Sequence, residues 1–253
     1  MCKTFMRLLI LGFCGWLATT SAAGSLRVAT EGAYPPFSFI NEEGQLAGFD
    51  VDIAREICRR LEKDCEIVAV PWNELLSRLM AGQHQMIVAS MSKTPEREQQ
   101  AEFTDPYYRT RNVFIGRRDV GVTQVNPETA RGKTLATQAD TTYAEYLQEK
   151  YATSTLKFTA TLTDAFTALA RSEVDLVLAD NLSTFEFLRS EVGQTLDIIG
   201  QPLTINETTE VAHIQVRKGD IQLRDAVNAA LRKIWLDGAY HRINARYFPF
   251  NVY

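Results

Sequence analysis

Hydrophobic residues in the first half of the chain alternate between short continuous runs and helical spacing. Largely apolar segments at 26–29 and 66–70 predict strands, and the continuous apolar run at 86–89 is typical of a buried strand. Between them, apolar positions that recur at helical intervals predict helices over 51–61 and 74–81, and Asp50 or Asp52 is expected to cap the first of these. Strands that alternate with helices in this way predict an α/β fold, with a mostly parallel sheet flanked by helices.

The same alternation restarts further along the chain and predicts a second α/β unit. Its expected elements are a strand at 132–137, helices at 143–150 and 163–171, and a strand at 174–178. A strand at 112–115 leads into this unit, and a strand at 211–216 leads out of it toward a final helix over 225–236. If the end of the chain packs on the first unit, two strands cross between the units, and such paired crossings make a hinge.

The N-terminal residues have the pattern of a secretory signal peptide. Lys3 and Arg7 flank the start, residues 8–18 are mostly apolar, and small residues follow at 21–23. The apolar run is about half the ~20 residues that a membrane-spanning helix needs. We therefore expect residues 1–23 to direct export and to be removed.

The rest of the chain is expected to form two lobes. Residues 24–111 together with 212–253 would form lobe 1, and residues 112–211 would form lobe 2, with the two-strand hinge between them.

Two cysteines, Cys58 and Cys65, remain after the signal peptide is removed. An exported protein with one remaining pair is expected to oxidise it. The spacing does not fit the Cys-x-x-Cys pattern of zinc or thioredoxin-like sites. A structural disulfide is therefore predicted, and two free buried thiols are the alternative.

Charge and motifs exclude several classes of function. The formal net charge is −4 and no block of Lys and Arg occurs, so nucleic-acid binding is not expected. Neither G-x-S-x-G nor H-E-x-x-H is present, and the three histidines lie far apart in the sequence. No cofactor or metal is expected.

Polar residues follow several of the predicted strands, where open α/β sheets bind their ligands. These residues offer hydroxyl groups, one arginine and separate carboxylates, which are the groups that a zwitterion requires. They include Glu31, Tyr34, Ser90, Ser92, Arg97, Gln138, Asp140, Thr141, Thr142 and Asp180.

Four sequence fragments in order resemble the amino-acid-binding proteins of ABC importers, solute-binding family 3. The fragments are Ala29–Phe37, Gly48–Asp52, Ser92–Arg97 and Phe103–Tyr108. The resemblance covers essentially the whole chain after the signal peptide. Cys58, Cys65 and the C-terminal Tyr247–Tyr253 segment are most similar to the lysine/arginine/ornithine and histidine binders.

The resemblance implies roles for the groups that would bind the amino-acid headgroup. Arg97 would grip the α-carboxylate as a bidentate fork, helped by Ser92 and Thr141. Asp180 would take the α-ammonium group together with Ser90 and Ser92.

The resemblance also implies a pocket for the ligand side chain. Tyr34 and Trp72 would enclose it, and Glu31 would meet a distal positive charge. Asp140 stands where the family usually has glycine or serine, and an acid there would repel a carboxylate unless it is turned away. Without the resemblance, Glu31 and Asp180 could be helix caps or surface acids, and a residue such as Trp72 is more often part of a core than of a ligand site.

The implied protein has the two-lobed type II periplasmic-binding-protein fold. It would be a periplasmic monomer that captures arginine, ornithine, lysine or histidine by cleft closure and presents it to a membrane permease, without being an enzyme. Opines remain open as ligands. The alternative is a periplasmic dehydratase on the same fold acting on a cyclic amino or keto acid, since fold alone does not separate the two.

Overall fold

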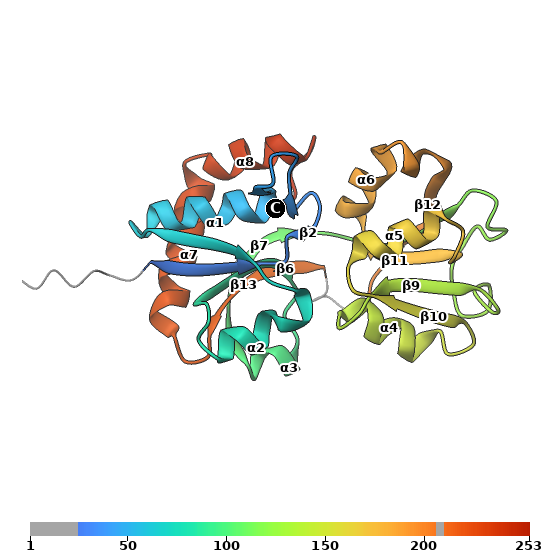
Figure 1. The fold of residues 1–253 in the computed structure, drawn as a ribbon, viewed down its shortest axis with the longest axis horizontal. Coiled ribbons are helices and arrows are strands. Elements are labelled where there is room, and N and C mark those ends of the chain that lie inside the picture. Colours follow the sequence, from blue (N-terminus) through green and yellow to red (C-terminus); the bar gives the residue numbers. More distant parts are fainter. Residues whose placement is uncertain (1–24, 206–209) are drawn as a thin grey trace, which may run out of the picture.

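The computed structural model describes residues 25–205 and 210–253 of the chain. These residues form two lobes that lie side by side along the long axis of the molecule (Figure 1). The predicted signal peptide at 1–23 lies outside the described residues. Within the described ranges, no helix is long and apolar enough to cross a membrane.

Lobe 1 is built on a five-stranded sheet with the strand order β5-β1-β6-β13-β7. The strands are β1 (Leu26–Thr30), β5 (Cys65–Ala69), β6 (Met86–Met91), β7 (Ala101–Arg109) and β13 (Val211–Arg217). The helices are α1 (Phe49–Arg60), α2 (Leu75–Met80), α3 (Pro95–Glu98), α7 (Ile221–Leu236), α8 (Ala239–Tyr247) and the short η1 (Trp72–Glu74). A small separate sheet is formed by β2 (Ala33–Tyr34), β3 (Ser38–Ile40) and β4 (Leu46–Ala47).

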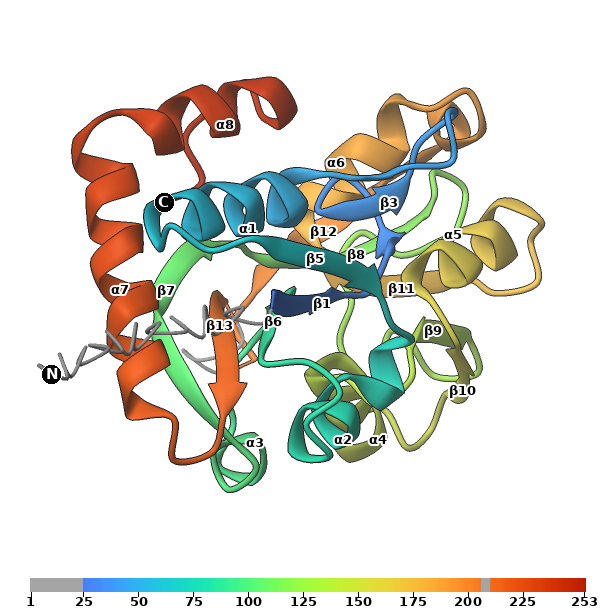
Figure 2. The same cartoon turned by 60° about the vertical axis from the view of Figure 1, so that its left-hand side comes forward.

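The sheet of lobe 1 is buried on both faces. Met86 and Val88 pack in the cluster that includes α1, α7 and α8, whereas Ile87 and Ala89 pack in the cluster that includes α2. Figure 2 shows these two groups of helices on opposite sides of the sheet. Because successive strand residues point to opposite faces, a strand covered on both sides must be apolar throughout, as the run at 86–89 is.

Lobe 2 repeats this arrangement with the strand order β10-β9-β11-β8-β12. The strands are β8 (Asn112–Arg117), β9 (Thr134–Gln138), β10 (Thr155–Thr159), β11 (Leu176–Asp180) and β12 (Leu196–Leu203). The helices are α4 (Thr142–Lys150), α5 (Leu162–Ala170), α6 (Asn181–Arg189) and the short η2 (Val192–Thr195).

Each sheet is mostly parallel, with one reversed strand. β13 runs opposite to its neighbours in lobe 1, and β8 does so in lobe 2. Both reversed strands are the first strands that the chain forms after it changes from one sheet to the other. The carboxyl ends of the other strands in each sheet therefore lie at one edge.

Two chain segments cross between the sheets, one from β7 to β8 and one from β12 to β13. They are hydrogen-bonded to each other, since the Thr110 amide donates to the Glu210 carbonyl oxygen at 2.9 Å. The side chain of Asn181, at the start of α6, accepts hydrogen bonds from the Thr110 hydroxyl and the Arg111 amide. The lobe limits at 111/112 and 211/212 stay a prediction.

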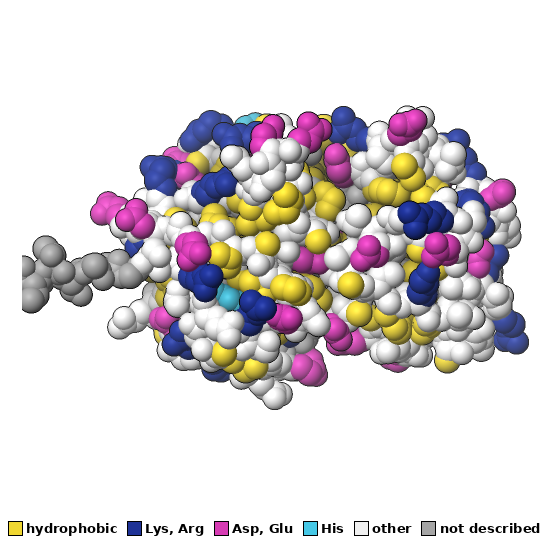
Figure 3. Space-filling model, in the orientation of Figure 1, with side chains coloured by type: hydrophobic (Ala, Val, Ile, Leu, Met, Phe, Trp, Pro, Cys, Tyr) yellow, Lys and Arg dark blue, Asp and Glu magenta, His cyan; other side chains and the backbone are white. Residues whose placement is uncertain are grey.

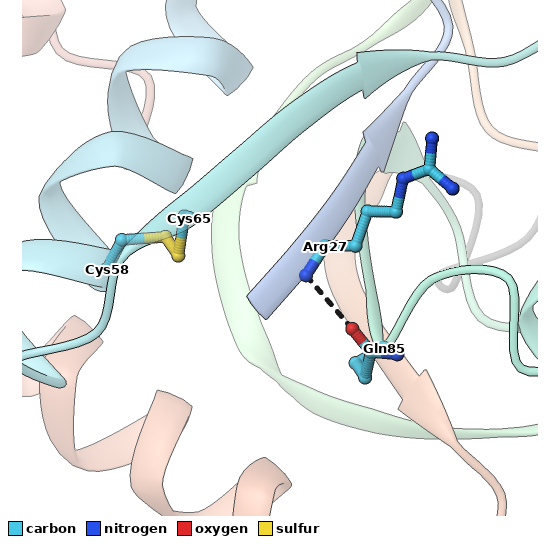
Figure 4. The surroundings of a disulfide bond; sticks show 4 residues. All are labelled: Arg27, Cys58, Cys65 and Gln85. Carbon is cyan, nitrogen blue, oxygen red and sulfur yellow. Dashed lines mark hydrogen bonds between the residues drawn. A yellow bond between two sulfur atoms is a disulfide. The ribbon is translucent and has the colours of Figure 1, made fainter. Parts of the chain in front are cut away.

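The predicted disulfide joins Cys58 in the last turn of α1 to Cys65 at the start of β5 (Figure 4). Closing so short a loop lowers the entropy of the unfolded chain and stabilises the fold by about 2 to 3 kcal/mol in the chain-entropy model. Close by, the Gln85 side chain accepts a hydrogen bond from the Arg27 amide at 2.9 Å (Figure 4). This bond satisfies a backbone donor of β1.

Two predicted helix starts are wrong. α1 begins at Phe49 with no side-chain cap, so neither Asp50 nor Asp52 caps it as predicted. Gly48 makes this start, since its φ is 124° and a Cβ there would lie 2.2 Å from the Phe37 carbonyl oxygen. α7 begins at Ile221, four residues before the predicted start, because Asp220 caps it by accepting a hydrogen bond from the Leu223 amide.

Charged side chains of both signs are distributed over the surface. On the face shown in Figure 3, Lys and Arg are interspersed with Asp and Glu over both lobes. That face has no clustered basic stripe.

Candidate functional site

A pocket lies between the lobes, and all eight residues predicted to bind ligand line it. Glu31, Tyr34, Trp72, Ser90, Ser92 and Arg97 come from lobe 1, and Thr141 and Asp180 come from lobe 2. The remaining lining residues are Ala89, Tyr108, Thr110, Thr137, Gln138, Thr142, Tyr143, Leu162, Val211 and Ala212.

The lining residues gather here because of the strand directions. Glu31 directly follows β1, Asp180 is the last residue of β11, and Gln138 is the last residue of β9. Each is at the carboxyl end of its strand, which is the edge where open α/β sheets bind ligands. Both lobes turn this edge toward the pocket.

Arg97 lies in the pocket wall with its guanidinium held in place. One of its terminal nitrogens (Nη1) donates to the carbonyl and hydroxyl oxygens of Ser92 at 3.0 and 3.3 Å, and the other (Nη2) donates to the Asp140 carbonyl oxygen at 3.3 Å. The guanidinium carbon is 5.4 Å from the centre of the Trp72 ring, which is cation–π geometry. Arg97 is only 9% exposed, and it forms no ion pair with the two acids that act on its charge, Glu145 and Glu96. A buried guanidinium held in this way suits an incoming carboxylate.

Asp180 both caps a helix and faces the pocket. One of its carboxylate oxygens accepts from the amides of Leu182 and Ser183 at the start of α6, at 2.9 and 2.8 Å. The other oxygen accepts from the Tyr34 hydroxyl across the cleft at 2.5 Å. Burial raises the pKa of Asp180, although these hydrogen bonds oppose the shift. The residue is therefore both a helix cap and a carboxyl group that lines the pocket.

The Ser90 hydroxyl is oriented by Asp50, which lies beneath the pocket. It donates to one carboxylate oxygen of Asp50 at 2.8 Å, and the Tyr107 hydroxyl donates to the other at 2.7 Å. Because the single hydroxyl proton of Ser90 is used, its oxygen can only accept hydrogen bonds from the pocket side. Ser90 also has a positive φ of 56°, and such uncommon backbone geometry clusters at binding sites.

Glu31 is a buried carboxylate, 8% exposed, that contacts the opposite lobe. The Gln138 side-chain amide donates to it at 2.6 Å. Burial raises the pKa of Glu31 to about 7, and the hydrogen bond from Gln138 only partly opposes this. A neighbouring positive charge would favour the ionised form.

Asp140 is turned away from the pocket. Its backbone has a φ of 57°, its side chain is exposed, and its carbonyl oxygen accepts from the Trp72 indole nitrogen at 2.9 Å. Positive φ explains the preference for glycine at this position, and aspartate is among the residues that tolerate it best. The acid therefore does not line the carboxylate side of the pocket.

The Thr141 hydroxyl makes its hydrogen bonds to the backbone around the start of α4. It donates to the Gln138 carbonyl oxygen at 2.8 Å and accepts from the Ala144 amide at 3.2 Å, which caps α4. The positive end of the α4 dipole consequently lies at the pocket, and helix N-termini favour anions.

The sequence of residues 26–250 matches the family described as bacterial extracellular solute-binding proteins, family 3. The chain belongs to this family.

Curated relatives of this solute-binding protein include two from Escherichia coli (strain K12). The putative ABC transporter arginine-binding protein 2 is 30% identical over 247 residues, which cover 97% of this chain and 98% of that protein. The histidine-binding periplasmic protein is 28% identical over 259 residues, which cover 98% and 99% of the two chains. These relatives are named as binding proteins and not as enzymes.

Solved structures confirm the predicted type II fold. An ancestral arginine-binding protein bound to arginine superposes with a TM-score of 0.81 at 29% identity, covering 89% of this chain and 98% of that chain. An ancestral amino acid-binding protein described as a precursor of cyclohexadienyl dehydratase superposes with a TM-score of 0.80 at 25% identity, covering 89% and 96%.

The solute-binding protein also has pocket residues that sequence reasoning did not assign. Gln138 was recognised as polar and at a strand end, but its pairing with Glu31 spans 107 residues and joins different lobes. Tyr108 and Tyr143 line the pocket too, and nothing in their local sequence distinguishes them from core aromatics.

Hydrogen bonds connect the two lobes directly across the pocket. Besides Tyr34 with Asp180 and Glu31 with Gln138, both Trp72 and Arg97 donate to the Asp140 carbonyl oxygen. Most of the side chains that would hold a ligand thus also hold the lobes together.

Proposed function

We propose that this protein is the exported, periplasmic component of an amino-acid ABC importer and that it captures a cationic L-amino acid, with arginine as the leading ligand. The carrying observation is that a buried arginine and two buried acids, Arg97, Asp180 and Glu31, line one pocket. A zwitterion uses one positive and one negative partner. The second buried acid gives a partner to a positively charged side chain.

The headgroup contacts follow from the hydrogen bonds of the pocket. Arg97 takes the α-carboxylate, assisted by Ser92 and by the α4 N-terminus at Thr141. Asp180 and the Ser90 hydroxyl oxygen accept hydrogen bonds from the α-ammonium group. The Ser90 hydroxyl can act as an acceptor there because it donates its own hydrogen bond to Asp50.

Glu31 takes the distal charge of the ligand side chain, which lies between Tyr34 and Trp72. Among the cationic amino acids, arginine is expected to bind a carboxylate most favourably, because its guanidinium presents paired N–H groups that match the two carboxylate oxygens. The names of the arginine- and histidine-binding relatives support this ligand class.

Capture proceeds by closure of the lobes around the ligand. The closed form must bind ligand more tightly than the open form, because a ligand with equal affinity for both would not shift the equilibrium between the open and closed forms. The closed monomer is then presented to a membrane permease, without turnover of the ligand.

A dehydratase acting on a cyclic amino or keto acid is the second candidate. Glu31 is the observation that favours it, because a buried carboxyl group with a pKa of about 7 suits a general acid. The solved precursor of cyclohexadienyl dehydratase has the same fold.

Calorimetric titration of the mature protein with the common L-amino acids and opines tests the proposed function. We expect L-arginine, ornithine, lysine or histidine to bind and to be recovered unchanged. No response to any cationic amino acid would refute the proposed ligand class, and loss of a hydroxyl group from a bound cyclic acid would establish the dehydratase instead.

The affinity for L-arginine is expected to fall at acidic pH because of Glu31. Burial raises the pKa of Glu31 to about 7, and the cation binds the ionised form of this residue. The affinity for L-arginine should therefore be highest at a pH well above 7 and should decrease as the pH falls below the pKa of Glu31. Between about pH 8 and pH 5.5 the dissociation constant should rise by about 30-fold. Titration with L-glutamine over the same range is the control, since a neutral side chain does not need an ionised Glu31. Equal pH dependence for both ligands would assign the effect to the headgroup acids.

A further inference from the structure

A second chamber adjoins the pocket on the other side of Glu31 and Trp72. It is open to solvent, and of the residues that line it only these two also line the inner pocket. Glu31 therefore lies between the inner pocket and the outer chamber and does not close off the inner pocket. A side chain that reaches Glu31 from the inner pocket has further space beyond it.

Small side chains keep this chamber open. Its walls include four alanines, two from each lobe: Ala33, Ala69, Ala139 and Ala160. Val70 and Pro71 add apolar surface, while the exposed Asp140 contributes a carboxylate. The chamber thus suits small apolar groups attached to a centre that keeps its positive charge.

The chemistry of Glu31 leaves room for such a group. One of its oxygens already accepts from Gln138, which lines only the inner pocket. A guanidinium has five N–H donors, and a bidentate pair with a carboxylate uses two of them. The remaining positions can carry an alkyl group without loss of this pair, and a methyl group needs only about as much space as a water molecule, about 30 Å³.

We propose that the outer chamber accepts an alkyl substituent on the cationic group of the ligand, so that N-methylated arginine and lysine side chains are ligands together with the unmodified amino acids. This inference rests on the proposed function, because it places the distal cation at Glu31. It assigns the chamber to substituents that preserve the charge. A neutral N-acyl group removes the cation that Glu31 requires.

The test is calorimetric titration of the mature protein with L-arginine, Nω-methyl-L-arginine, asymmetric dimethyl-L-arginine, L-lysine and Nε-acetyl-L-lysine. Both methylated arginines should bind within about fivefold of L-arginine, because an open chamber imposes no steric cost, whereas overpacking a closed site costs about 10- to 100-fold. Nε-acetyl-L-lysine should bind at least about 30-fold more weakly than L-lysine.

Ala160→Leu tests the chamber itself. Ala160 is exposed in the chamber wall, and the substitution leaves in place its backbone carbonyl, which accepts from Gln138. The ratio of affinities for asymmetric dimethyl-L-arginine and L-arginine should fall by about 20-fold in this variant. Ala152→Leu is the matched control, since Ala152 is an exposed alanine of lobe 2 that does not line the chamber, and the ratio should not change.

Failure of this inference differs from failure of the proposed function. Binding of L-arginine with a loss of about tenfold or more for both methylated forms would overturn the chamber proposal alone. An affinity ratio that Ala160→Leu leaves unchanged would do the same. Failure of arginine and its methylated forms alike would overturn both proposals.

Discussion

Replacing Arg97 with alanine should weaken the binding of every amino acid, cationic or neutral, by about 1,000-fold, because it removes the buried partner of the α-carboxylate. The guanidinium is fixed by Ser92, by the Asp140 carbonyl oxygen and by the Trp72 ring, so little ordering is needed when a ligand arrives. Calorimetric titration with L-arginine and L-glutamine would measure both losses, with circular dichroism to establish that the variant is folded.

Arg97→Lys separates charge from geometry at this position. Lysine keeps a positive charge but lacks the planar fork, so the loss should be intermediate, about 30-fold. Lys93 provides a control of charge alone, since it pairs with Glu98 and does not line the pocket, and Lys93→Ala should leave affinity unchanged. If the Arg97→Ala variant bound amino acids with wild-type affinity, Arg97 would not be a ligand-binding residue.

The lobe architecture and the main charged residues of the pocket were predictable from sequence because they depend on local patterns. Apolar runs such as 86–89 mark buried strands, and parallel strands end at a common edge. Glu31 and Asp180 were therefore expected to lie at such an edge before any contact between the lobes was known. The resemblance to solute-binding proteins then implied which part of an amino-acid ligand each of these residues would bind.

Contacts that join distant segments were not predictable in this way. The bond between Ser90 and Asp50 depends on a left-handed residue at the end of β6 and on a helix start that Gly48 makes. Asp50 looked like a helix cap because it is acidic and near the start of a helix, but it is fully buried. No local pattern distinguishes these two placements.

Some helix starts were misplaced, and α6 was not predicted at all. The first turn of α7 contains residues without strong helical periodicity, so its start was placed four residues late, although Asp220 is a good cap. α6 begins with Asn181-Leu182-Ser183-Thr184, where three of the four residues are poor helix formers. It forms because Asp180 caps it and because Leu182 is buried in the core of lobe 1, which is a tertiary contact.

Glu31→Gln should convert the protein from a binder of cationic amino acids into one that no longer distinguishes charge. At about pH 8, where Glu31 is ionised, the substitution should weaken L-arginine by about 100-fold or more, since it leaves a buried cation without its counter-ion. The loss for L-glutamine should stay within about threefold, because a neutral side chain makes no ion pair. The replacement has the same shape, and its carbonyl oxygen can still accept from Gln138, so the contact between the lobes is retained.

The decisive quantity is the difference between the two losses, measured by calorimetric titration of the wild type and the variant with both ligands. Gln138→Ala is the informative companion, because it removes the donor that orients Glu31 while leaving the carboxylate in place. It should cost L-arginine only about tenfold, since misplacing a carboxylate is less severe than removing its charge. Equal losses of arginine and glutamine in Glu31→Gln would mean that Glu31 holds the lobes together through Gln138 and does not bind the side chain of the ligand.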